Sequence, residues 1–500
     1  MTTSIFIFHN DLRLQDNTGL EFALKNYDIV IPVFIAESAQ LDKNKLKSDN
    51  AVQFMYESLS ELDEKLKKKD SKIHLLYNAD SLLELCKKVN PEAVISNANY
   101  TPFAIKRDLD YADICKKHNC KFLLFEDFGL LPIGAQKDNP NPFIASLDKE
   151  IPENSRCEYL LNFIATSETK VYQKYTPYYN NIKSINIRNP TRNNKSNYGK
   201  INSVGKLKIF GPDKLKEYFQ PNSVCSELFP GGRSEGLKRV NKIPNDYGQT
   251  RNDLDNETSQ LSAYIKFGCV SIREVYWPAK GNTDFIKQLY WRDFYMNIIW
   301  QYPNVLSNNW DNANFKEKYS KVKWETQKSA SKDEKNKFKD WCNGETGYPI
   351  VDAAMRQLNQ TGYMHNRGRL ITSGFLVKLM GWHWREGELY FAKKLVDYDP
   401  ASNNGNWQFI SGSGVDSQPY YRILNPLRQS EKFDPEGVYI LKYLPELESL
   451  IKSKVGHIHN WPDHYKDYPN EEHPDVEYYK PIIDYTYSRD KIKKMYKKIF

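Results

Sequence analysis

The sharpest local feature of this 500-residue chain is the segment from Asp397 to Trp407. Two carboxylates stand two positions apart, at Asp397 and Asp399, and four consecutive Asn or Gly positions precede Trp407. Carboxylates and amides at this spacing are suited to form a hydrogen-bonding floor beneath a flat heterocycle. Asn, Gly, Pro and Asp also favour turns, so the alternative is a plain loop between two helices whose side chains bond their own backbone.

Tryptophan is distributed unevenly along the chain. All ten tryptophans lie between Trp277 and Trp461. Indole offers a flat surface that stacks on bases or cofactors, and it gives up an electron to a strongly oxidising neighbour. The unevenness therefore indicates two domains with different roles, although an aromatic-rich helical core would also account for it.

A second polar group surrounds a predicted helix pair. Pro349 suits the first turn of a helix that ends at Gly362, and the next helix is expected to stop at Gly381. The polar residues of the two helices and of the stretch between them are Arg356, Asn359, His365, Asn366, Arg367 and Arg369. Arginine at a helix start favours phosphate, because the N–H groups there attract anions.

Composition places the chain among globular proteins, with 40% apolar and 27% charged residues. Its length suggests about two to three domains. No apolar run is long enough to span a membrane, and the start reads as a strand and not as a signal peptide. The seven cysteines form no CxxC pair, so no disulfide framework or metal cluster is indicated. The scattered cysteines fit a reducing cytosolic compartment, and we expect a monomer without an obligate protein partner. The net charge of +8 permits a nucleic-acid partner.

The amino-terminal part predicts an α/β fold with a doubly wound parallel sheet. Short apolar runs alternate with helical patterns, and one such helix begins after Ser48. The expected strands are 4–8, 29–35, 72–77, 93–96 and 121–125. No GxGxxG follows the first strand, so a Rossmann dinucleotide site is not supported. We expect an α/β domain over 1–130, a connector over 131–211 and a helical domain over 212–500.

Several long motifs, in the right order, resemble the photolyase/cryptochrome family over nearly the whole chain. These motifs occupy 8–17, 258–262, 290–295, 346–358, 363–367, 384–388, 397–407 and 421–426. His9 departs from the opening motif, where the family usually has Arg. The resemblance implies FAD in the helical domain, damaged DNA as the partner and deoxyribodipyrimidine photo-lyase activity. It also implies an antenna chromophore, a folate or a deazaflavin, for which the segment 97–108 after the fourth strand is suitably placed.

The resemblance assigns FAD contacts residue by residue. The implied cofactor-binding residues are Tyr247, Thr258, Ser259, Gln260, Leu261, Ser262, Arg292, Asn366, Arg369, Asp397, Asp399 and Asn403. Arg369 and Asp397 correspond to a buried ion pair beside the flavin ring, where a cation favours the anionic reduced form; a purely structural bridge is the alternative. Asn403 corresponds to the residue that faces flavin N5. The plant photoreceptors carry an acid there and the animal ones tend to carry Cys, so Asn favours a repair enzyme.

Three tryptophans correspond to the electron relay of the family. Trp407 is nearest to the flavin, Trp384 follows, and Trp324 lies outermost. Trp382 is a further indole near them in the sequence. A positive hole passes between indoles only if they nearly touch, which the sequence does not show.

The implied lesion-binding residues are Arg251, Gln288, Trp291, Arg367 and Arg422. Trp291 corresponds to the tryptophan that stacks on the extruded lesion, and the arginines to phosphate contacts at the rim. Gln288 replaces the Glu that is usual in cyclobutane-dimer enzymes, which is the pattern of (6-4) photolyases. Those enzymes, however, carry paired histidines where this chain has His365 and Asn366.

The sequence thus favours light-driven repair of cyclobutane pyrimidine dimers by electron transfer from reduced FAD. The alternatives are (6-4) repair, for which His365 would be the proton donor, and a cryptochrome-type blue-light receptor. Receptors of this family usually add a long polar tail, whereas the last residues here have a helical pattern. Together with Asn403, this favours the repair enzyme.

Overall fold

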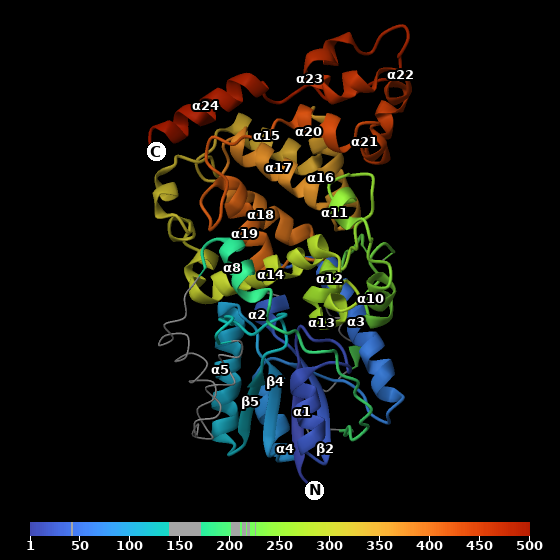
Figure 1. Ribbon diagram of the computed structural model, residues 1–500, viewed down its shortest axis with the longest axis vertical. Coiled ribbons are helices and arrows are strands. Elements are labelled where there is room, and N and C mark those ends of the chain that lie inside the picture. Colours follow the sequence, from blue (N-terminus) through green and yellow to red (C-terminus); the bar gives the residue numbers. More distant parts are fainter. Residues whose placement is uncertain (42–43, 140–171, 202–210, 213–216, 218–220, 226) are drawn as a thin grey trace. The chain divides into compact units, whose positions relative to one another are not determined.

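The computed structural model describes residues 1–41, 44–139, 172–201, 211–212, 217, 221–225 and 227–500 (Figure 1). The chain divides into two compact units, each described by itself below. Unit 1 comprises Met1–Ile243, Ser259–Pro303 and Asp399–Ser402, and unit 2 comprises Pro244–Thr258, Asn304–Tyr398 and Asn403–Phe500. Much of the predicted connector, 140–171 and 202–210, lies outside the described residues. The boundaries at 130 and 211 stay a prediction.

Unit 1 contains the predicted parallel sheet. Its strands are β1 (Thr3–Phe8), β2 (Ile29–Ala36), β3 (His74–Tyr77), β4 (Ala93–Asn97) and β5 (Lys121–Phe125), in the order β3-β2-β1-β4-β5. All four pairings are parallel. The five expected strands and the doubly wound fold are confirmed, and β3 begins two residues later than expected. The order reverses between β1 and β4, which is where ligands bind on such sheets.

Helices flank the sheet because buried strands need an apolar cover on both faces (Figure 1). Those of unit 1 are α1 (Thr18–Asn26), α2 (Ser38–Leu41), α3 (Asp49–Lys67), α4 (Asp80–Val89), α5 (Pro102–Lys117), α8 (Tyr175–Ile182), α10 (Arg233–Val240), α12 (Ser262–Lys266), α13 (Ile272–Tyr276) and α14 (Thr283–Gln301). The expected cap at Ser48 is confirmed, since its side chain accepts the N–H of Ala51. Asn17 and Thr101 cap α1 and α5 in the same way.

Unit 2 is helical. Its α-helices are α11 (Tyr247–Thr250), α15 (Lys332–Asn343), α16 (Pro349–Thr361), α17 (Asn366–Lys378), α18 (Trp384–Lys394), most of α19 (Pro400–Ser411), α20 (Pro426–Phe433), α21 (Val438–Tyr443), α22 (Glu448–His459), α23 (Trp461–His464) and α24 (Tyr485–Lys497). Short 3₁₀ turns are η1 (Pro303–Leu306), η2 (Trp310–Asn312), η3 (Glu317–Lys321), η4 (Pro445–Leu447) and η5 (Tyr465–Asp467). The predicted pair is α16 and α17: Gly362 ends α16 in the left-handed conformation, but α17 ends at Lys378, before Gly381. Within the described residues, no helix combines the length and apolarity needed to cross a membrane.

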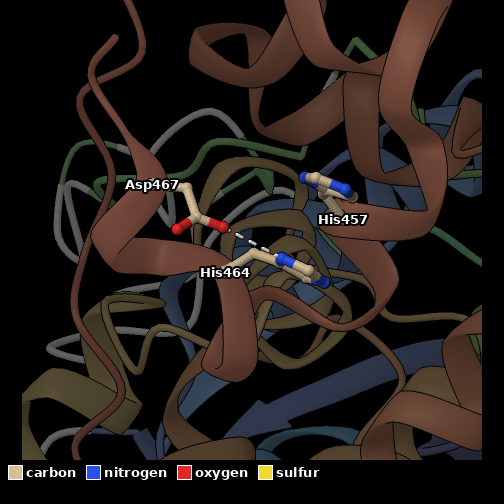
Figure 2. Close-up of side chains that lie close together, drawn as sticks. All are labelled: His457, His464 and Asp467. Carbon is tan, nitrogen blue, oxygen red and sulfur yellow. Dashed lines mark hydrogen bonds and ion pairs between the residues drawn. The ribbon is translucent and has the colours of Figure 1, made fainter.

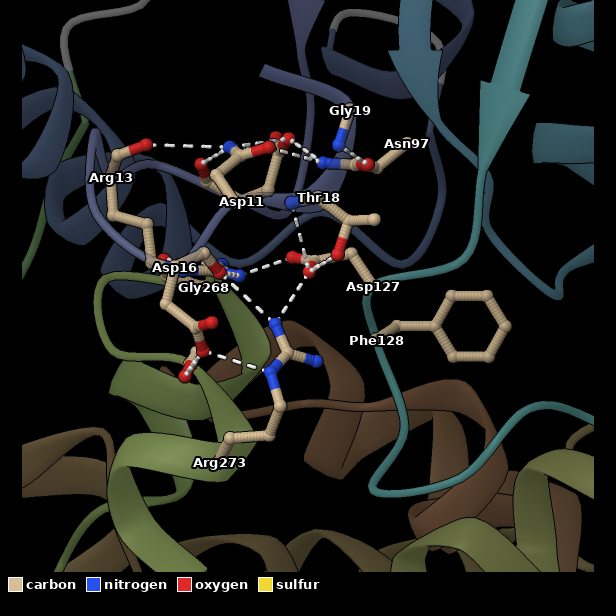
Figure 3. Close-up of polar contacts among 12 residues, drawn as sticks. Asp11, Arg13, Asp16, Thr18, Gly19, Asn97, Asp127, Phe128, Gly268 and Arg273 are labelled. Atoms are coloured by element: carbon tan, nitrogen blue, oxygen red, sulfur yellow. Dashed lines mark hydrogen bonds and ion pairs between the residues drawn. The ribbon is translucent and has the colours of Figure 1, made fainter. Parts of the chain in front are cut away.

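A buried charge cluster joins distant segments of unit 1 (Figure 3). The Arg273 guanidinium lies 2.8 Å from a carboxylate oxygen of Asp16 and 2.6 Å from one of Asp127. Arg13 makes a second ion pair with Asp127, and Ser271 donates to Asp16. All four charged side chains are at most 5% exposed. Burial alone would raise the pKa of Asp127, but the two guanidinium groups outweigh it and lower the pKa to about 2.

We expect Asp127→Asn to lower the free energy of unfolding by about 3–5 kcal/mol, because it leaves two buried guanidinium groups short of a partner. The folded pKa lies below the unfolded one, so the contribution of Asp127 is complete above about pH 4 and is lost as the pH falls towards 2. Denaturant unfolding at several pH values measures both effects. Glu84→Gln, which breaks an exposed ion pair with Lys87, should leave the midpoint unchanged; equal effects of the two variants would contradict this account.

Candidate active site

The segment from Asp397 to Trp407 is mostly helical. Helix α18 ends at Lys394, and Asn403 and Trp407 lie on α19, which begins at Pro400. The alternative of a plain helix-to-helix loop is therefore wrong for residues 400–407 of the segment. Asp399 stands just before the helix and accepts the N–H of Ser402 at 2.8 Å, as an N-cap residue does.

Tertiary hydrogen bonds explain why Asn-rich α19 is helical despite its low helix propensity. Asn404 donates to the carbonyl of Val305 at 3.1 Å, and Gln408 donates to that of Ala313, also at 3.1 Å. Gln408 also donates to Asn404 at 2.8 Å. Asn404 and Gln408 are buried, so these bonds satisfy amides that would otherwise oppose folding. Asn403, one position earlier on the helix, takes no part in these bonds.

The predicted ion pair between Arg369 and Asp397 is present in unit 2. Nη2 of Arg369 lies 3.0 and 2.8 Å from the two carboxylate oxygens, and its Nε donates to the carbonyl of Met364 at 2.9 Å. Asp397 is 3% exposed, while Arg369 keeps 25% of its side chain accessible. The pair thus presents a fixed positive edge to its surroundings, the arrangement that suits an anionic ring.

Among the buried polar atoms of unit 2 that have no hydrogen-bond partner in the described residues are Nδ2 of Asn403 and Nε2 of His365. Such atoms are rare in folded proteins, and they mark places where a ligand atom completes the bonding. A buried amide donor on Asn403 fits a flavin ring nitrogen. The side chains present therefore fit the isoalloxazine ring that the sequence implies.

His365 caps α17, and its Nδ1 accepts the N–H of Arg367 at 3.1 Å. Burial first, and then the charges of Arg369 and Arg367, lower the pKa of His365 to about 4. The imidazole is consequently neutral at physiological pH. Its Nδ1 is hydrogen-bonded to the backbone of α17, and its Nε2 is buried.

The other predicted FAD contacts fall in both units. In unit 2, Tyr247 begins α11, Thr258 Oγ1 lies 3.5 Å from the hydroxyl of Tyr363, and Asn366 is exposed at the start of α17. In unit 1, Ser259, Gln260 and Leu261 lead into α12, which begins at Ser262. Gln260 has a left-handed backbone, with φ 49°, and accepts a bond from Arg239.

Arg292 and Asp399 line a pocket within unit 1. Arg292 donates to the carbonyl of Phe128, and the hydroxyl of Tyr100 bonds to Asp399. Tyr100 and Lys266 line the same pocket. Burial first, and then Asp399, raise the pKa of Tyr100 well above its usual value, so the phenol stays a donor. The sequence did not single out Tyr100 for the flavin, although it lies in the segment 97–108 considered for an antenna.

Trp384 is the first residue of α18, and Trp407 packs on the same helix. The Trp407 indole lies against Gly387, where an added Cβ would stand 2.2 Å from the ring, and its centroid is 5.0 Å from that of Phe391. Trp384, which precedes Gly387 by one turn of α18, donates its N–H to Asn314 at 2.9 Å. Trp382 instead packs on Phe338, with centroids 4.4 Å apart. The outermost predicted member, Trp324, lies beside His383 and Tyr496.

We expect Gly387→Ala to displace Trp407, because the new methyl group has no space beside the indole. Overpacking of this kind costs about 1–3 kcal/mol, and the variant should also retain less flavin. Gly374→Ala, on α17, is the matched control, since its Cβ would lie 3.7 Å from Leu424, an ordinary van der Waals distance. Thermal unfolding and flavin absorbance per mole of protein measure both effects. A Gly387→Ala protein as stable and as coloured as the control would refute the packing argument.

Trp291, on α14, stacks face to face with Tyr175 of α8. The ring centroids are 3.8 Å apart and the planes differ by 6°. The Tyr175 hydroxyl also donates to the carbonyl of Lys287 at 2.8 Å, which ties α8 to α14. Gln288, on the same helix, donates to the carbonyl of Asp284 at 3.2 Å. The sequence did not identify Tyr175 as a partner of Trp291, because Tyr175 falls in the predicted connector. The tyrosines that cluster between 172 and 179 were the signal that could have indicated it.

The predicted rim arginines lie in unit 2. Arg367 bonds to Asn252 at 2.5 Å, and its guanidinium lies 4.0 Å from the centre of the Phe433 ring. Burial first, and then the charge of Arg251, lower the pKa of Arg367, which places these two cations near each other. Arg422 is exposed. Neighbouring cations that repel one another suit a polyanionic ligand.

A separate histidine group lies at His457, His464 and Asp467 (Figure 2). The two imidazole rings stack with centroids 3.9 Å apart and planes 5° apart. Their Nδ1 atoms lie 2.8 Å from the Tyr468 hydroxyl and 3.1 Å from Asp467 respectively. Stacked rings direct their lone pairs along parallel planes and not towards one point. The two imidazole rings therefore form a stacked pair that hydrogen bonds to Tyr468 and Asp467 hold in place, and we assign no metal to them.

Comparisons with known proteins identify the family of this chain. The family model "FAD binding domain of DNA photolyase" matches residues 285–498, and the model "DNA photolyase" matches residues 4–144. The deoxyribodipyrimidine photo-lyase of Buchnera aphidicola subsp. Baizongia pistaciae is 31% identical over 98% of this chain and 97% of its own. That of Escherichia coli is 29% identical over 91% of this chain and 92% of its own.

Solved structures show the same fold. An archaeal photolyase from Sulfolobus tokodaii, described with two FAD molecules, is 34% identical with a TM-score of 0.81, and each chain is covered completely. A class III photolyase from Agrobacterium tumefaciens is 27% identical with a TM-score of 0.81, over 100% of this chain and 98% of its own. The chain therefore belongs to the DNA photolyase family and carries the FAD-binding domain of that family.

Proposed function

We propose that this protein repairs cyclobutane pyrimidine dimers in DNA under blue light, with reduced FAD as the electron donor. The observation that carries the proposal is the buried, unpartnered amide of Asn403. A neutral amide is able to donate to or accept from a flavin nitrogen, and so it tolerates the reduced ring that repair requires. Relatives named deoxyribodipyrimidine photo-lyase support the same reading.

In this proposal FAD supplies the light absorption and the transferred electron, and the protein supplies position and charge. Arg369, held by Asp397, provides a positive edge that favours an anionic ring. Tyr247, Thr258, Asn366 and the stretch 259–262 offer hydroxyl, amide and backbone donors for the phosphates and the chain that joins them. Arg292 and Asp399 hold the pocket of unit 1. No nucleophile is required.

The lesion is read by an aromatic platform and hydrogen-bonding groups. Trp291, backed by Tyr175, offers one face to an extruded dimer. Gln288 bonds the edges of the damaged bases, and the rim arginines, Arg251, Arg367 and Arg422, bind the phosphates. We further propose a monomer without an obligate protein partner, located with the DNA in the prokaryotic cytoplasm or the eukaryotic nucleus.

His365 argues against the (6-4) alternative. That reaction needs a protonated histidine beside the lesion, whereas this imidazole is neutral at physiological pH because its pKa is lowered to about 4. Its Nδ1 already accepts a backbone N–H, so protonation there would also break the cap of α17. We assign His365 the role of orienting α17. The receptor alternative is disfavoured by the amide at Asn403.

An antenna chromophore belongs to the proposal. The carboxyl ends of β1 and β4, where the strand order reverses, are the part of the sheet suited to hold a folate, a deazaflavin or a second flavin. Asn97 is not available for this, because its amide bonds Asp11, Asn17 and Gly19. The chromophore released by heating the purified protein identifies which of the three it is.

Purified, photoreduced protein should restore oligonucleotides that contain a thymine dimer in blue light and leave them unchanged in the dark. Parallel oligonucleotides with a (6-4) photoproduct should stay unrepaired, because His365 is neutral. Chromatography of the products measures both. Repair of the (6-4) lesion would favour the alternative enzyme, and repair of neither lesion by a flavin-loaded protein would favour the receptor.

We expect Tyr175→Ala to weaken binding of the lesion by about tenfold, because Trp291 loses its backing and with it part of a base-aromatic contact that is worth about 1–3 kcal/mol. Turnover at saturating DNA should change little, because Tyr175 lies behind the platform. Tyr175→Phe, which keeps the ring, should bind like the parent. Fluorescence anisotropy gives the affinity; a Tyr175→Ala protein that binds normally but turns over slowly would contradict a positioning role.

A further inference from the structure

Three indoles of unit 2 surround one imidazole. The His383 ring stacks on Trp384, with centroids 5.7 Å apart and planes 26° apart, and on Trp310 at 4.9 Å and 24°. Trp324 meets the same imidazole edge to face, at 6.1 Å and 79°. Electron tunnelling weakens steeply with the gap between aromatic edges. From Trp384, the shortest stacked route through His383 therefore leads to Trp310, which the sequence did not connect with the relay.

The two outer indoles, Trp310 and Trp324, are both half-buried, but their N–H groups differ. Nε1 of Trp324 is buried and has no acceptor among the described residues. The N–H of Trp310, by contrast, is not completely buried, and it has no acceptor in the described part of the chain. An oxidised indole becomes strongly acidic and is trapped when it loses its N–H proton. Trp310 is open to water for this step, whereas Trp324 lacks a proton acceptor.

Buried side chains hold the segment that carries Trp310. Arg385 donates to the carbonyls of Val305 at 3.1 Å and Ser307 at 2.7 Å. Asn404 donates to the same Val305 carbonyl, and Gln408 bonds the backbone at Ala313 beyond the tryptophan. Both flanks of η2 are thus tied to α18 and α19. The stacking of Trp310 on His383 follows from these bonds and is not an accident of an exposed loop.

The local charges favour movement of a hole away from Trp384. The Arg385 guanidinium lies 4.9 Å from the centre of that indole, and a nearby cation disfavours a second positive charge on the ring. Its ion pair with Glu388 at 2.6 Å moderates this effect. Burial first, and then Arg385, lower the pKa of His383 to about 3. The imidazole between the indoles is consequently uncharged and adds no barrier of its own.

We propose that the electron relay branches at His383 and that Trp310 is its main exit to solvent. The inference rests on the proposed function, because it concerns how FAD is returned to the reduced state. One electron passes from Trp310 across His383 to the oxidised Trp384, which is thereby restored. Trp310 then releases its indole proton to water and is left as a neutral radical. A thiol in solution returns a hydrogen atom to it, and two thiyl radicals combine to a disulfide.

The test compares FAD-loaded Trp310→Phe, Trp324→Phe and the double variant with the parent chain. Trp407→Phe, which removes the first relay member, defines the blocked rate. Trp277→Phe is the matched control, a half-exposed tryptophan of unit 1. Two readouts are taken: the rate of flavin photoreduction with a thiol present, and the position of nitroso spin-trap adducts, mapped by peptide mass spectrometry. Flavin content and thermal midpoint show that each variant is folded.

We expect Trp324→Phe to keep at least half of the parent rate and Trp310→Phe to lose most of it. The double variant should fall to the blocked rate, and the adduct should lie on Trp310. A Trp324→Phe protein at the blocked rate, a Trp310→Phe protein like the parent, or adducts on Trp324 alone would overturn the inference. Repair of dimers by chemically reduced protein depends on the proposed function only. Its failure, with the photoreduction pattern intact, would reject repair and leave the branch standing.

Discussion

Unit 1 depends on the neutralisation of two buried carboxylates. Asp16 and Asp127 come from loops at the carboxyl side of the sheet, and Arg273 from the start of α13 reaches both (Figure 3). A charge buried without a partner would cost several kcal/mol, so the sheet and the segment around Arg273 must fold together. Since α13 leads into α14, the cluster also fixes where Trp291 and Arg292 lie. The pocket that contains Arg292 and Asp399 also has Asp127 in its wall.

In unit 2, buried side-chain amides, and not charged groups, link distant segments of the chain. Asn404 and Gln408 are buried and bond to backbone carbonyls of the chain between Val305 and Ala313. These bonds hold α19 helical and at the same time hold the chain that carries Trp310. In the proposed relay, structure and electron transfer are linked, because the amides that stabilise the helix also position the rings around His383. The proposed relay thus depends on buried hydrogen bonds as much as on aromatic packing.

The chemistry of the site relies on groups that stay in one protonation state. His365 and His383 are kept neutral by burial and by neighbouring arginines. Both cap a helix through Nδ1, so a proton on that nitrogen would weaken α17 or α18 as well. The positive charge in the neighbourhood resides on arginine, which does not lose its proton at any physiological pH. Electron transfer in such a site needs no movement of protons until the outermost indole.

The sequence by itself determined the elements whose patterns are local. The five strands, the cap at Ser48 and the end of α16 at Gly362 follow from side-chain periodicity and backbone preference, and the family followed from long motifs. The helical state of α19 did not follow, since its Asn and Gly residues favour turns and only the bonds that its side-chain amides donate to distant carbonyls override this preference. The pairing of Tyr175 with Trp291, of Arg273 with Asp16, and of Trp310 with His383 was decided by tertiary structure. These partners are far apart in the chain, and nothing in a local pattern records which buried group meets which.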